Sequence, residues 1–247
     1  TENENTKDMP PIKIYKFGGA SVRSAEGVEN LARIVAAEPA RLLVIVSAMG
    51  KTTNALEEVL DRFMRNRSDE AIERFAEIER YHRQIVRSLF AAPSSVEART
   101  EKLASEVREL LRSETCREDY DRWYDRIVSY GELLSTVIVS EYLAAQGTPN
   151  RWLDMRGLFV TDSLRRAVDE APERVLVGQG FIGATPAGHP TTLGREGSDY
   201  SAAMAGYLLD AGSVTIWKDV DGILSADPRL FADTTLLPGL SYLDAIE

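Results

Sequence analysis

Residues 12–50 read IKIYKFGGASVRSAEGVENLARIVAAEPARLLVIVSAMG, and this stretch decides the fold. Residues 12–17 alternate apolar and polar side chains and end at Gly18-Gly19, which is typical of a strand that runs into a turn. Apolar residues recur at helical spacing between 25 and 37, and 42–46 is a continuous apolar run of the buried-strand type. A strand, a helix and a buried strand in this order predict parallel strands joined by a right-handed crossover.

The rest of the chain continues this pattern around one long helical stretch. Residues 54–128 are highly charged, contain no glycine and carry apolar residues at helical spacing, so we expect a helical insertion. Beyond it we expect an apolar helix over 129–145, short strands over 151–154 and 174–179, a helix over 199–209 and a strand over 214–218. The prediction is an α/β fold with a mainly parallel central sheet and a helical insertion.

Composition and charge exclude several classes of protein. The chain has 247 residues, of which 44% are hydrophobic and 28% charged, and this excludes collagen-like and wholly disordered chains. The net charge of −10, with no local basic stripe, argues against a nucleic-acid partner. The longest uncharged apolar stretch, 42–50, is far shorter than the ~20 residues of a membrane span, so we expect no membrane partner.

The beginning of the chain and its cysteine content bear on localisation. Residues 1–11, TENENTKDMPP, lack the apolar segment of a signal peptide and predict a disordered tail. Cys116 is the single cysteine, which excludes an internal disulfide and fits a reducing compartment, so we expect a cytoplasmic protein. His82 and His189 are not paired at ligand spacing, and His82 lies on an apolar helical stripe, so we expect a structural role for His82 and no resident metal site.

Two motifs that resemble phosphate-binding loops fail on their context. Gly50-Lys51-Thr52 looks like the end of a Walker A loop, but the glycine required five positions earlier is replaced by Ile45 inside a predicted strand. Residues 178–183, GQGFIG, fit a dinucleotide fingerprint literally, yet such a fingerprint must open a helix, and prolines and glycine follow here. Neither motif therefore predicts a nucleotide site.

Two other glycine-containing turns are more informative. Residues 16–21, KFGGAS, lie at a strand's carboxyl end, where glycines let backbone N–H groups approach an anion and Lys16 supplies a positive charge. A tight turn with a solvated lysine explains this spacing equally well. Residues 192–199, TLGREGSD, precede a predicted helix, whose N-terminus favours an anion. Alternatively, Ser198 is only an N-cap and Asp199 a first-turn acid.

Residues 129–132, SYGE, also have two interpretations. Their S-x-x-E form is that of a capping box, in which Glu132 reaches back to the N–H of Ser129. The other interpretation is a carboxylate that serves a ligand. Ser47 and Thr53 follow the second buried strand, where ligands of open α/β sheets bind, although small polar residues are common in loops.

Six blocks of this sequence resemble those of aspartokinases, within the amino-acid-kinase fold, in both order and spacing. They are KFGGASV (16–22), VSAMGKTTN (46–54), SYGE (129–132), QGFIG (179–183), TLGREGSD (192–199) and KDVDGILSADPR (218–229). The resemblance extends from residue 12 to the end of the chain. It implies a three-layer sandwich that transfers the γ-phosphoryl group of ATP, with Mg²⁺, to the side-chain carboxylate of L-aspartate, the first step toward lysine, threonine and methionine.

The resemblance also implies roles for individual residues. Lys16 would contact the transferred phosphoryl group, and Asp199 would organise the site around it. Arg195 would hold the α-carboxylate of aspartate and Glu132 its α-ammonium group. The amino-acid pocket would be lined by Ser47, Thr53, Phe181 and Ser198. The nucleotide would be bound by Lys16, Gly18, Gly19, Ser21, Lys218, Asp219, Leu224 and Arg229.

The chain departs from the family pattern at several positions. Ala20 stands where the family has a hydroxyl, Glu196 where it often has glycine, and Leu224 where it often has tyrosine. The family continues beyond residue 247 into a segment with a second phosphate-facing lysine and then into paired ACT domains. The resemblance therefore implies that residues 12–247 are a catalytic-domain fragment, whose intact form is a homo-oligomer assembled through ACT domains. Two alternatives stay open: another carboxylate kinase of this fold, or a fragment that binds ligands with impaired turnover.

Overall fold

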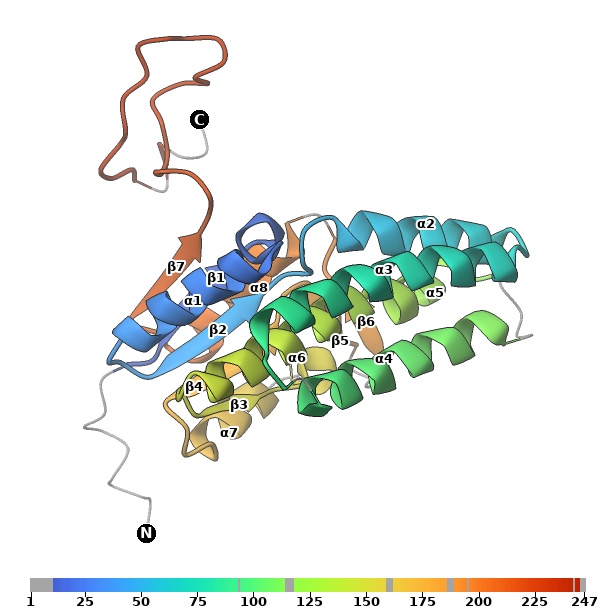
Figure 1. Ribbon diagram of the computed structural model, residues 1–247. Coiled ribbons are helices and arrows are strands. Elements are labelled where there is room, and N and C mark those ends of the chain that lie inside the picture. The colour runs from blue at the N-terminus through green and yellow to red at the C-terminus, as the bar shows by residue number, and fades with distance from the viewer. Residues whose placement is uncertain are drawn as a thin grey trace. The chain divides into compact units, whose positions relative to one another are not determined.

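The computed structural model describes residues 11–92, 94–113, 118–158, 162–185, 189–194, 196–241 and 243–244. The predicted tail, except for Pro11, and Cys116 lie outside the described residues. The chain divides into two compact units, Thr1–Trp217 and Lys218–Glu247, which we describe separately. Figure 1 labels the helices and strands of the first unit.

A parallel five-stranded sheet forms the centre of the first unit. Its strand order is β3-β4-β2-β1-β7, and every neighbouring pair is parallel. The strands are β1 (Lys13–Phe17), β2 (Leu42–Val46), β3 (Asn150–Trp152), β4 (Val175–Gln179) and β7 (Ser213–Trp217). The parallel arrangement predicted from residues 12–50 is confirmed, because β1 and β2 pair in register from Lys13–Leu42 to Phe17–Val46.

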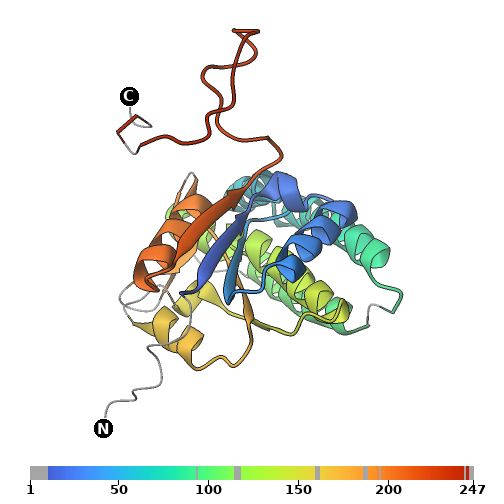
Figure 2. The same ribbon diagram turned by 90° about the vertical axis from the view of Figure 1, so that its left-hand side faces the viewer.

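Helices cover both faces of this sheet. Leu42, Val44 and Val46 point to a core shared with α1 (Ala25–Ala37) and α6 (Tyr130–Ala145). Leu43 and Ile45 point to the opposite core, shared with α7 (Ser163–Asp169) and α8 (Gly197–Leu208). Figure 2 shows α1 and α8 on opposite sides of the sheet. Because alternate residues of a strand face opposite sides, one uninterrupted apolar strand feeds both cores, and the predicted three-layer α/β sandwich is confirmed.

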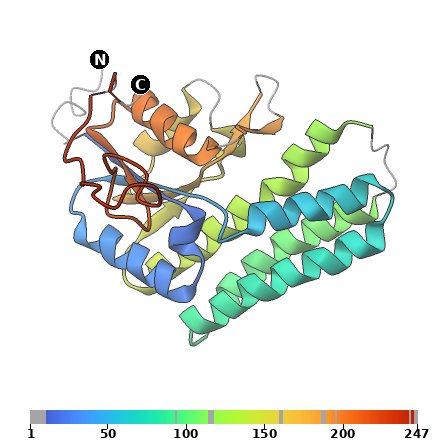
Figure 3. The ribbon, with the colours of Figure 1, turned by 90° about the horizontal axis from the view of Figure 1, so that it is seen from above.

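The stretch predicted as a helical insertion is helical over most of its described length. It contains α2 (Thr52–Met64), α3 (Ser68–Leu89), α4 (Ser94–Arg112) and α5 (Tyr120–Val128). These helices share a buried core with the first half of α6, including the edge-to-face pair Phe63–Trp123. Figure 3 shows them extending to one side of the sheet. The insertion is thus packed onto the sandwich through α6 rather than tethered by loops alone.

Most predicted elements lie within two residues of their observed positions, whereas several short elements were not predicted. The latter are α7, the antiparallel hairpin β5 (Ile182–Ala184) with β6 (Pro190–Thr192), and the 3₁₀ turns Gly19–Val22 and Met155–Gly157. The GxGxxG-like stretch enters this hairpin and opens no helix, so rejecting a dinucleotide fingerprint is confirmed. Short hairpins and single turns carry too little periodicity to be recognised.

One helical stretch is longer and more apolar than expected from the sequence, in which 42–50 was the longest uncharged apolar stretch. Tyr120–Ala145, comprising α5 and α6, would pass for a membrane span by length and composition, but 89% of its most apolar window is buried inside the protein. The expectation that no segment of the chain is long enough to span a membrane was therefore wrong for the length of this helical stretch. Burial identifies α6 as the core helix between the sheet and the insertion.

The second unit, Lys218–Glu247, contains few regular elements. Leu224 and Leu236 form an isolated antiparallel bridge, and the Leu237 N–H donates to the Ile223 carbonyl at 2.9 Å. Arg229 pairs with Asp227 at 2.7 Å. These contacts fold the segment back on itself.

Candidate active site

The candidate site lies where three parallel strands end. β1, β2 and β4 finish at the same edge of the sheet, and the loops that follow them meet the N-terminus of α8. A pocket of about 720 Å³ opens there. It is lined by Lys16, Ser47, Thr53, Asn54, Glu57, Tyr120, Asp121, Tyr124, Asp125, Glu132, Phe181, Thr191, Thr192, Gly194, Glu196, Gly197, Ser198 and Asp199. Carboxyl ends of parallel strands are where α/β proteins bind their ligands.

Lys16 and Asp199 form the charged centre of this pocket. The Lys16 Nζ lies 2.5 Å from Asp199 Oδ1, although the two residues are far apart in the sequence. Lys16 is only 6% exposed, so the interpretation as a solvated lysine at the end of a strand is wrong. The strand's alternation directs Lys16 to the α8 face of the sheet, together with Ile14. The fold therefore brings a fixed cation and an acid of the first helical turn together.

The glycines after β1 allow two chain segments to approach closely. A Cβ on Gly19 would lie 2.6 Å from the Ala48 carbonyl oxygen, so only glycine fits this position. The Gly50 N–H donates to the Gly19 carbonyl at 2.9 Å, which joins the turns after β1 and β2. A Cβ on Gly18 would lie 3.6 Å from Lys16 Nζ, so Gly18 borders the lysine head. Gly18, Gly19 and Ser21 do not line the pocket itself.

The N-terminus of α8 is unusual in its backbone. Glu196 occupies the N-cap position with φ of 56°, and no side chain caps the helix. Ser198 lies inside the first turn and is buried, so the interpretation of Ser198 as an N-cap is wrong. Phe181 also has a positive φ, 66°, and its N–H donates to Ser201 Oγ at 2.9 Å. Left-handed backbone is costly for residues other than glycine, so the surrounding contacts hold these two residues in place beside the pocket.

Glu132 is buried at the start of α6 and makes no capping box. Its Oε1 accepts a hydrogen bond from the Ala48 N–H at 3.1 Å, and the Ser129 side chain forms no cap. Glu132 Oε2 has no hydrogen-bond partner among the described residues. Glu132 therefore joins the start of α6 to the loop after β2 and faces the pocket, which favours the ligand interpretation over the cap.

Burial changes the acidity of Glu132. Its side chain is 2% exposed, and burial raises its pKa from 4.5 to about 8, against the opposing effect of the Ala48 N–H. The charged form of a buried carboxyl is disfavoured unless a cation reaches it. Glu132 is therefore mainly protonated near neutral pH until a positive group enters the pocket.

The insertion contributes pocket residues that the sequence reading missed. Asp125 Oδ1 of α5 accepts hydrogen bonds from the Thr192 N–H at 2.8 Å and from Thr192 Oγ1 at 2.7 Å. Tyr124 donates to Glu57 Oε1 of α2 at 2.8 Å and makes an edge-to-face contact with Phe181. The repeated Tyr-Asp pair at 120–121 and 124–125 was a usable signal, because residues four apart share one helical face.

The other predicted site residues divide into three groups. Ser47 and Thr53 line the pocket as expected. Arg195 lies outside the described residues. The predicted nucleotide residues Lys218, Asp219, Leu224 and Arg229 belong to the second unit. Within that unit, Leu224 forms a backbone bridge with Leu236, and Arg229 forms an ion pair with Asp227.

Acidic groups predominate around the pocket. Glu57, Asp121, Asp125, Glu132 and Glu196 line it together with Asp199, whereas Lys16 is its one cation among the described residues. In the same part of the chain, no group of three or more His, Cys, Asp or Glu side chains is arranged to hold a metal ion. The pocket thus combines one buried cation at the sheet with two carboxylates at the start of α8 and further carboxylates on the insertion side.

Comparisons with known proteins agree with this geometry. The model of the amino acid kinase family matches residues 11–247. The chain is 33% identical over 257 residues to the chloroplastic bifunctional aspartokinase/homoserine dehydrogenase 1 of Zea mays, covering 95% of this chain and 28% of that protein. It is 31% identical over 260 residues to the lysine-sensitive aspartokinase 3 of Escherichia coli strain K12, covering 97% and 56%.

A solved structure shows the same arrangement. Aspartokinase III of E. coli in complex with aspartate and ADP superposes with a TM-score of 0.75 at 29% identity, covering 92% of this chain and 53% of that chain. The chain thus spans 28% to 56% of the length of these relatives. The resemblance to aspartokinases stated from the six sequence blocks is confirmed by the names of these proteins. A family match over nearly the whole chain, together with the shared fold, shows that this chain belongs to the amino acid kinase family.

Proposed function

We propose that the protein is an aspartate kinase, which transfers the γ-phosphoryl group of ATP to the side-chain carboxylate of L-aspartate. The observation that carries this proposal is one pocket lined both by buried Lys16, which pairs with Asp199, and by buried Glu132. The similarity to an aspartokinase that binds aspartate and ADP supports the choice of substrates.

Recognition of the amino acid would use opposite charges at its two ends. Glu132 faces the pocket with one carboxylate oxygen that has no partner among the described residues, and an α-ammonium group would supply the missing cation. Arg195 would hold the α-carboxylate, since its planar fork suits a carboxylate. Ser47, Thr53, Phe181 and Ser198 would form the remaining walls.

The chemistry needs charge neutralisation more than proton transfer. An aspartate side chain has a pKa of about 3.9 in solution and is ionised at neutral pH, so no general base is required. Its oxygen attacks the γ-phosphorus, the bond to the bridging oxygen breaks, and ADP leaves with the bonding electrons. The obstacle is repulsion between a carboxylate and the polyphosphate. Lys16 would offset this repulsion at the γ-phosphoryl group, and Asp199 would hold the Lys16 Nζ in place.

The residues present fit a nucleotide-bound Mg²⁺. Mg²⁺ in kinases is held by one or two carboxylates together with substrate phosphates and water, so a preformed cage of three side chains is not needed. Asp199 is the pocket carboxylate next to Lys16 and would be its protein ligand. Bound there, Mg²⁺ would neutralise part of the phosphate charge.

The turns after β1 and the second unit would bind the nucleotide. Gly18, Gly19 and Ser21 would present backbone N–H groups and a hydroxyl to the phosphates, as the resemblance implies. Lys218, Asp219, Leu224 and Arg229 would contact the rest of ATP. We further propose that the intact enzyme, like its longer relatives, carries additional domains through which it forms a homo-oligomer, and that it acts in the cytoplasm.

Two assays on the purified chain test the activity. Aspartyl phosphate is trapped as the hydroxamate while ADP release is followed, with L-aspartate, L-glutamate, N-acetyl-L-glutamate and carbamate as acceptors. Aspartate-dependent formation of both products supports the proposal. Turnover of another acceptor in preference to aspartate contradicts it. Calorimetric titration with aspartate and ATP then separates an inactive binding fragment from a protein that binds neither.

A further inference from the structure

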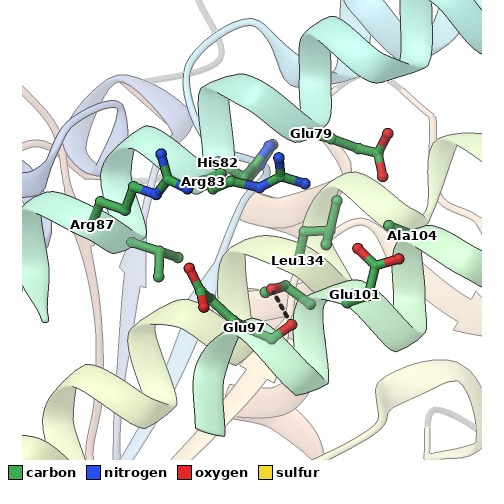
Figure 4. A pocket seen from close by; sticks show the side chains of 10 residues that line it. Glu79, His82, Arg83, Arg87, Glu97, Glu101, Ala104 and Leu134 are labelled. Atoms are coloured by element: carbon green, nitrogen blue, oxygen red, sulfur yellow. Dashed lines mark hydrogen bonds between the residues drawn. The ribbon is translucent and has the colours of Figure 1, made fainter. Parts of the chain in front are cut away.

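A second cavity lies in the helical insertion, apart from the candidate active site. It has a volume of about 330 Å³ and lies between α3 and α4, with Leu134 of α6 as its floor. Ligand pockets begin at about 300 Å³, so this cavity suits a small molecule. Figure 4 shows its side chains, and none of them also lines the pocket at Lys16.

The two walls of this cavity carry opposite charges. Arg83 and Arg87 are one turn apart on α3, and Glu97 projects from α4 on the other side (Figure 4). Within the described ranges, no ion pair within 4 Å connects any of these three side chains to another residue. The walls therefore offer two cations and an anion to a molecule between them.

One end of the cavity is already fixed by an ion-pair network. Arg108 of α4 pairs with Glu79 of α3 and with Glu101 of its own helix. This network holds the two helices together at the Glu79 end, and it accounts for two of the three glutamates that line the cavity. Glu97 is the glutamate left for a ligand.

The rest of the lining is apolar or uncharged. Val86, Ala104 and Leu134 are buried and form an aliphatic surface. His82 is also buried; its Nδ1–H donates to the Ile78 carbonyl at 2.8 Å, and burial lowers its pKa to about 4. The histidine is therefore neutral near pH 7, and its Nε2 is an acceptor with no partner among the described residues. This wall adds no further cation.

We propose that the cavity between α3 and α4 is a second binding site, which takes a small α-amino acid as its zwitterion. The carboxylate lies toward Arg83 and Arg87, the ammonium group lies toward Glu97, and a short aliphatic side chain rests on Leu134. Only a molecule that carries both charges and an apolar part satisfies all three features of the lining.

The helix α6 connects this cavity to the active-site pocket, so a ligand bound in the cavity can affect substrate binding. Leu134 and Glu132 are two residues apart on α6, Leu134 in the floor of this cavity and Glu132 in the pocket with Lys16. A ligand that draws α3 and α4 together packs against the same turn that presents Glu132. This coupling rests on the proposed role of Glu132 in aspartate binding, and it predicts that occupancy changes the KM for aspartate more than kcat.

Thermal shift and calorimetry on the 247-residue chain test the proposal. The probes are glycine, L-alanine, L-threonine and L-methionine at millimolar concentration, with propionate, ethylamine and inorganic phosphate as probes that lack one of the charges. We expect at least one amino acid to raise Tm and to bind at one site, while the incomplete probes have no such effect. No shift with any amino acid, or an equal shift with propionate or phosphate, overturns the proposal.

Variants locate the binding site. The double variant Arg83→Ala with Arg87→Ala should raise the Kd for the amino acid by at least about tenfold, and so should the single variant Glu97→Gln. Arg80→Ala, an exposed arginine of α3 outside the cavity, is the matched control and should leave binding unchanged. Glu132→Gln should also leave it unchanged. Binding that survives both cavity variants but is lost in Glu132→Gln belongs to the active-site pocket and overturns the proposal.

Discussion

The two sides of the active-site pocket differ in whether their buried ionisable group has a charged partner within the protein. On the sheet side, Lys16 is buried but has Asp199 at 2.5 Å, so its charge is compensated within the protein. On the insertion side, Glu132 is buried without a cation paired to it among the described residues, it accepts a hydrogen bond from the Ala48 N–H, and burial raises its pKa to about 8. The difference indicates a preorganised cation for the phosphoryl group and a carboxylate that becomes charged when the substrate ammonium arrives.

Removal of the sheet-side cation should have the largest effect. Lys16→Ala is expected to lower kcat by about 10²-fold or more, on the scale of losing one preorganised charge-stabilising group. Because Lys16 is buried against Asp199, the substitution should also reduce the free energy of unfolding by about 1–3 kcal/mol. Steady-state kinetics and denaturant unfolding measure the two effects. Lys51→Ala, which replaces an exposed lysine, is the control. A change in kcat below about threefold for Lys16→Ala would show that Lys16 does not act at the phosphoryl group.

Neutralising the insertion side should affect substrate binding instead. Glu132→Gln keeps an acceptor for the Ala48 N–H but loses the charge, so the KM for aspartate should rise about tenfold, or about 1.4 kcal/mol. The Tm and the KM for ATP should change little, because the wild-type side chain is mainly neutral in the free protein near pH 7. A lower Tm with an unchanged aspartate KM would show that Glu132 is purely structural.

The same carboxyl predicts two opposite pH trends. The raised pKa means that the folded protein holds a proton which the unfolded chain releases near pH 4.5, so this group's contribution to stability is complete below about pH 4.5 and is lost as the pH rises to about 8. Aspartate binding should strengthen over that rise, by up to about tenfold per pH unit, because the ammonium group needs the charged form. Unfolding and aspartate titrations from pH 6 to 8 measure both trends. Equal slopes in the wild type and in Glu132→Gln would contradict this account.

The smallest effect is expected at the contact between α5 and the β5–β6 hairpin. Asp125→Ala removes both hydrogen bonds from Thr192, so the aspartate KM should rise about threefold and stability should fall by about 1 kcal/mol. Asp125→Asn keeps an acceptor oxygen and should behave nearly like the wild type. If Asp125→Asn raises the aspartate KM as much as Asp125→Ala does, the charge of Asp125 contributes to aspartate binding in addition to the charge of Glu132.

Sequence patterns predicted the sandwich and one side of the pocket better than the other. The alternation of β1, the apolar run of β2 and the glycines after β1 are local features, and the parallel sheet with Lys16 at the end of β1 follows from them. The repeated Tyr-Asp pair marks one face of α5 in the sequence, but what Tyr124 and Asp125 contact depends on α5 folding back over the hairpin, so their place in the pocket was missed. For Glu132, the capping box and the ligand were equal alternatives in the sequence, and the hydrogen bond from the Ala48 N–H decides against the cap.

The sequence by itself determined the family, through six blocks that resemble those of aspartokinases. It also determined the order of strands and helices along the chain, because hydrophobic periodicity and glycine positions act over a few neighbouring residues. It could not determine which charges are buried or paired. Lys16 and Asp199 are far apart in the sequence, and they meet because the strand order β4-β2-β1-β7 places α8 over the end of β1. The state of Glu132 was likewise decided by tertiary structure, since burial between α6 and the loop after β2 raises its pKa, and burial is a property of the packed molecule.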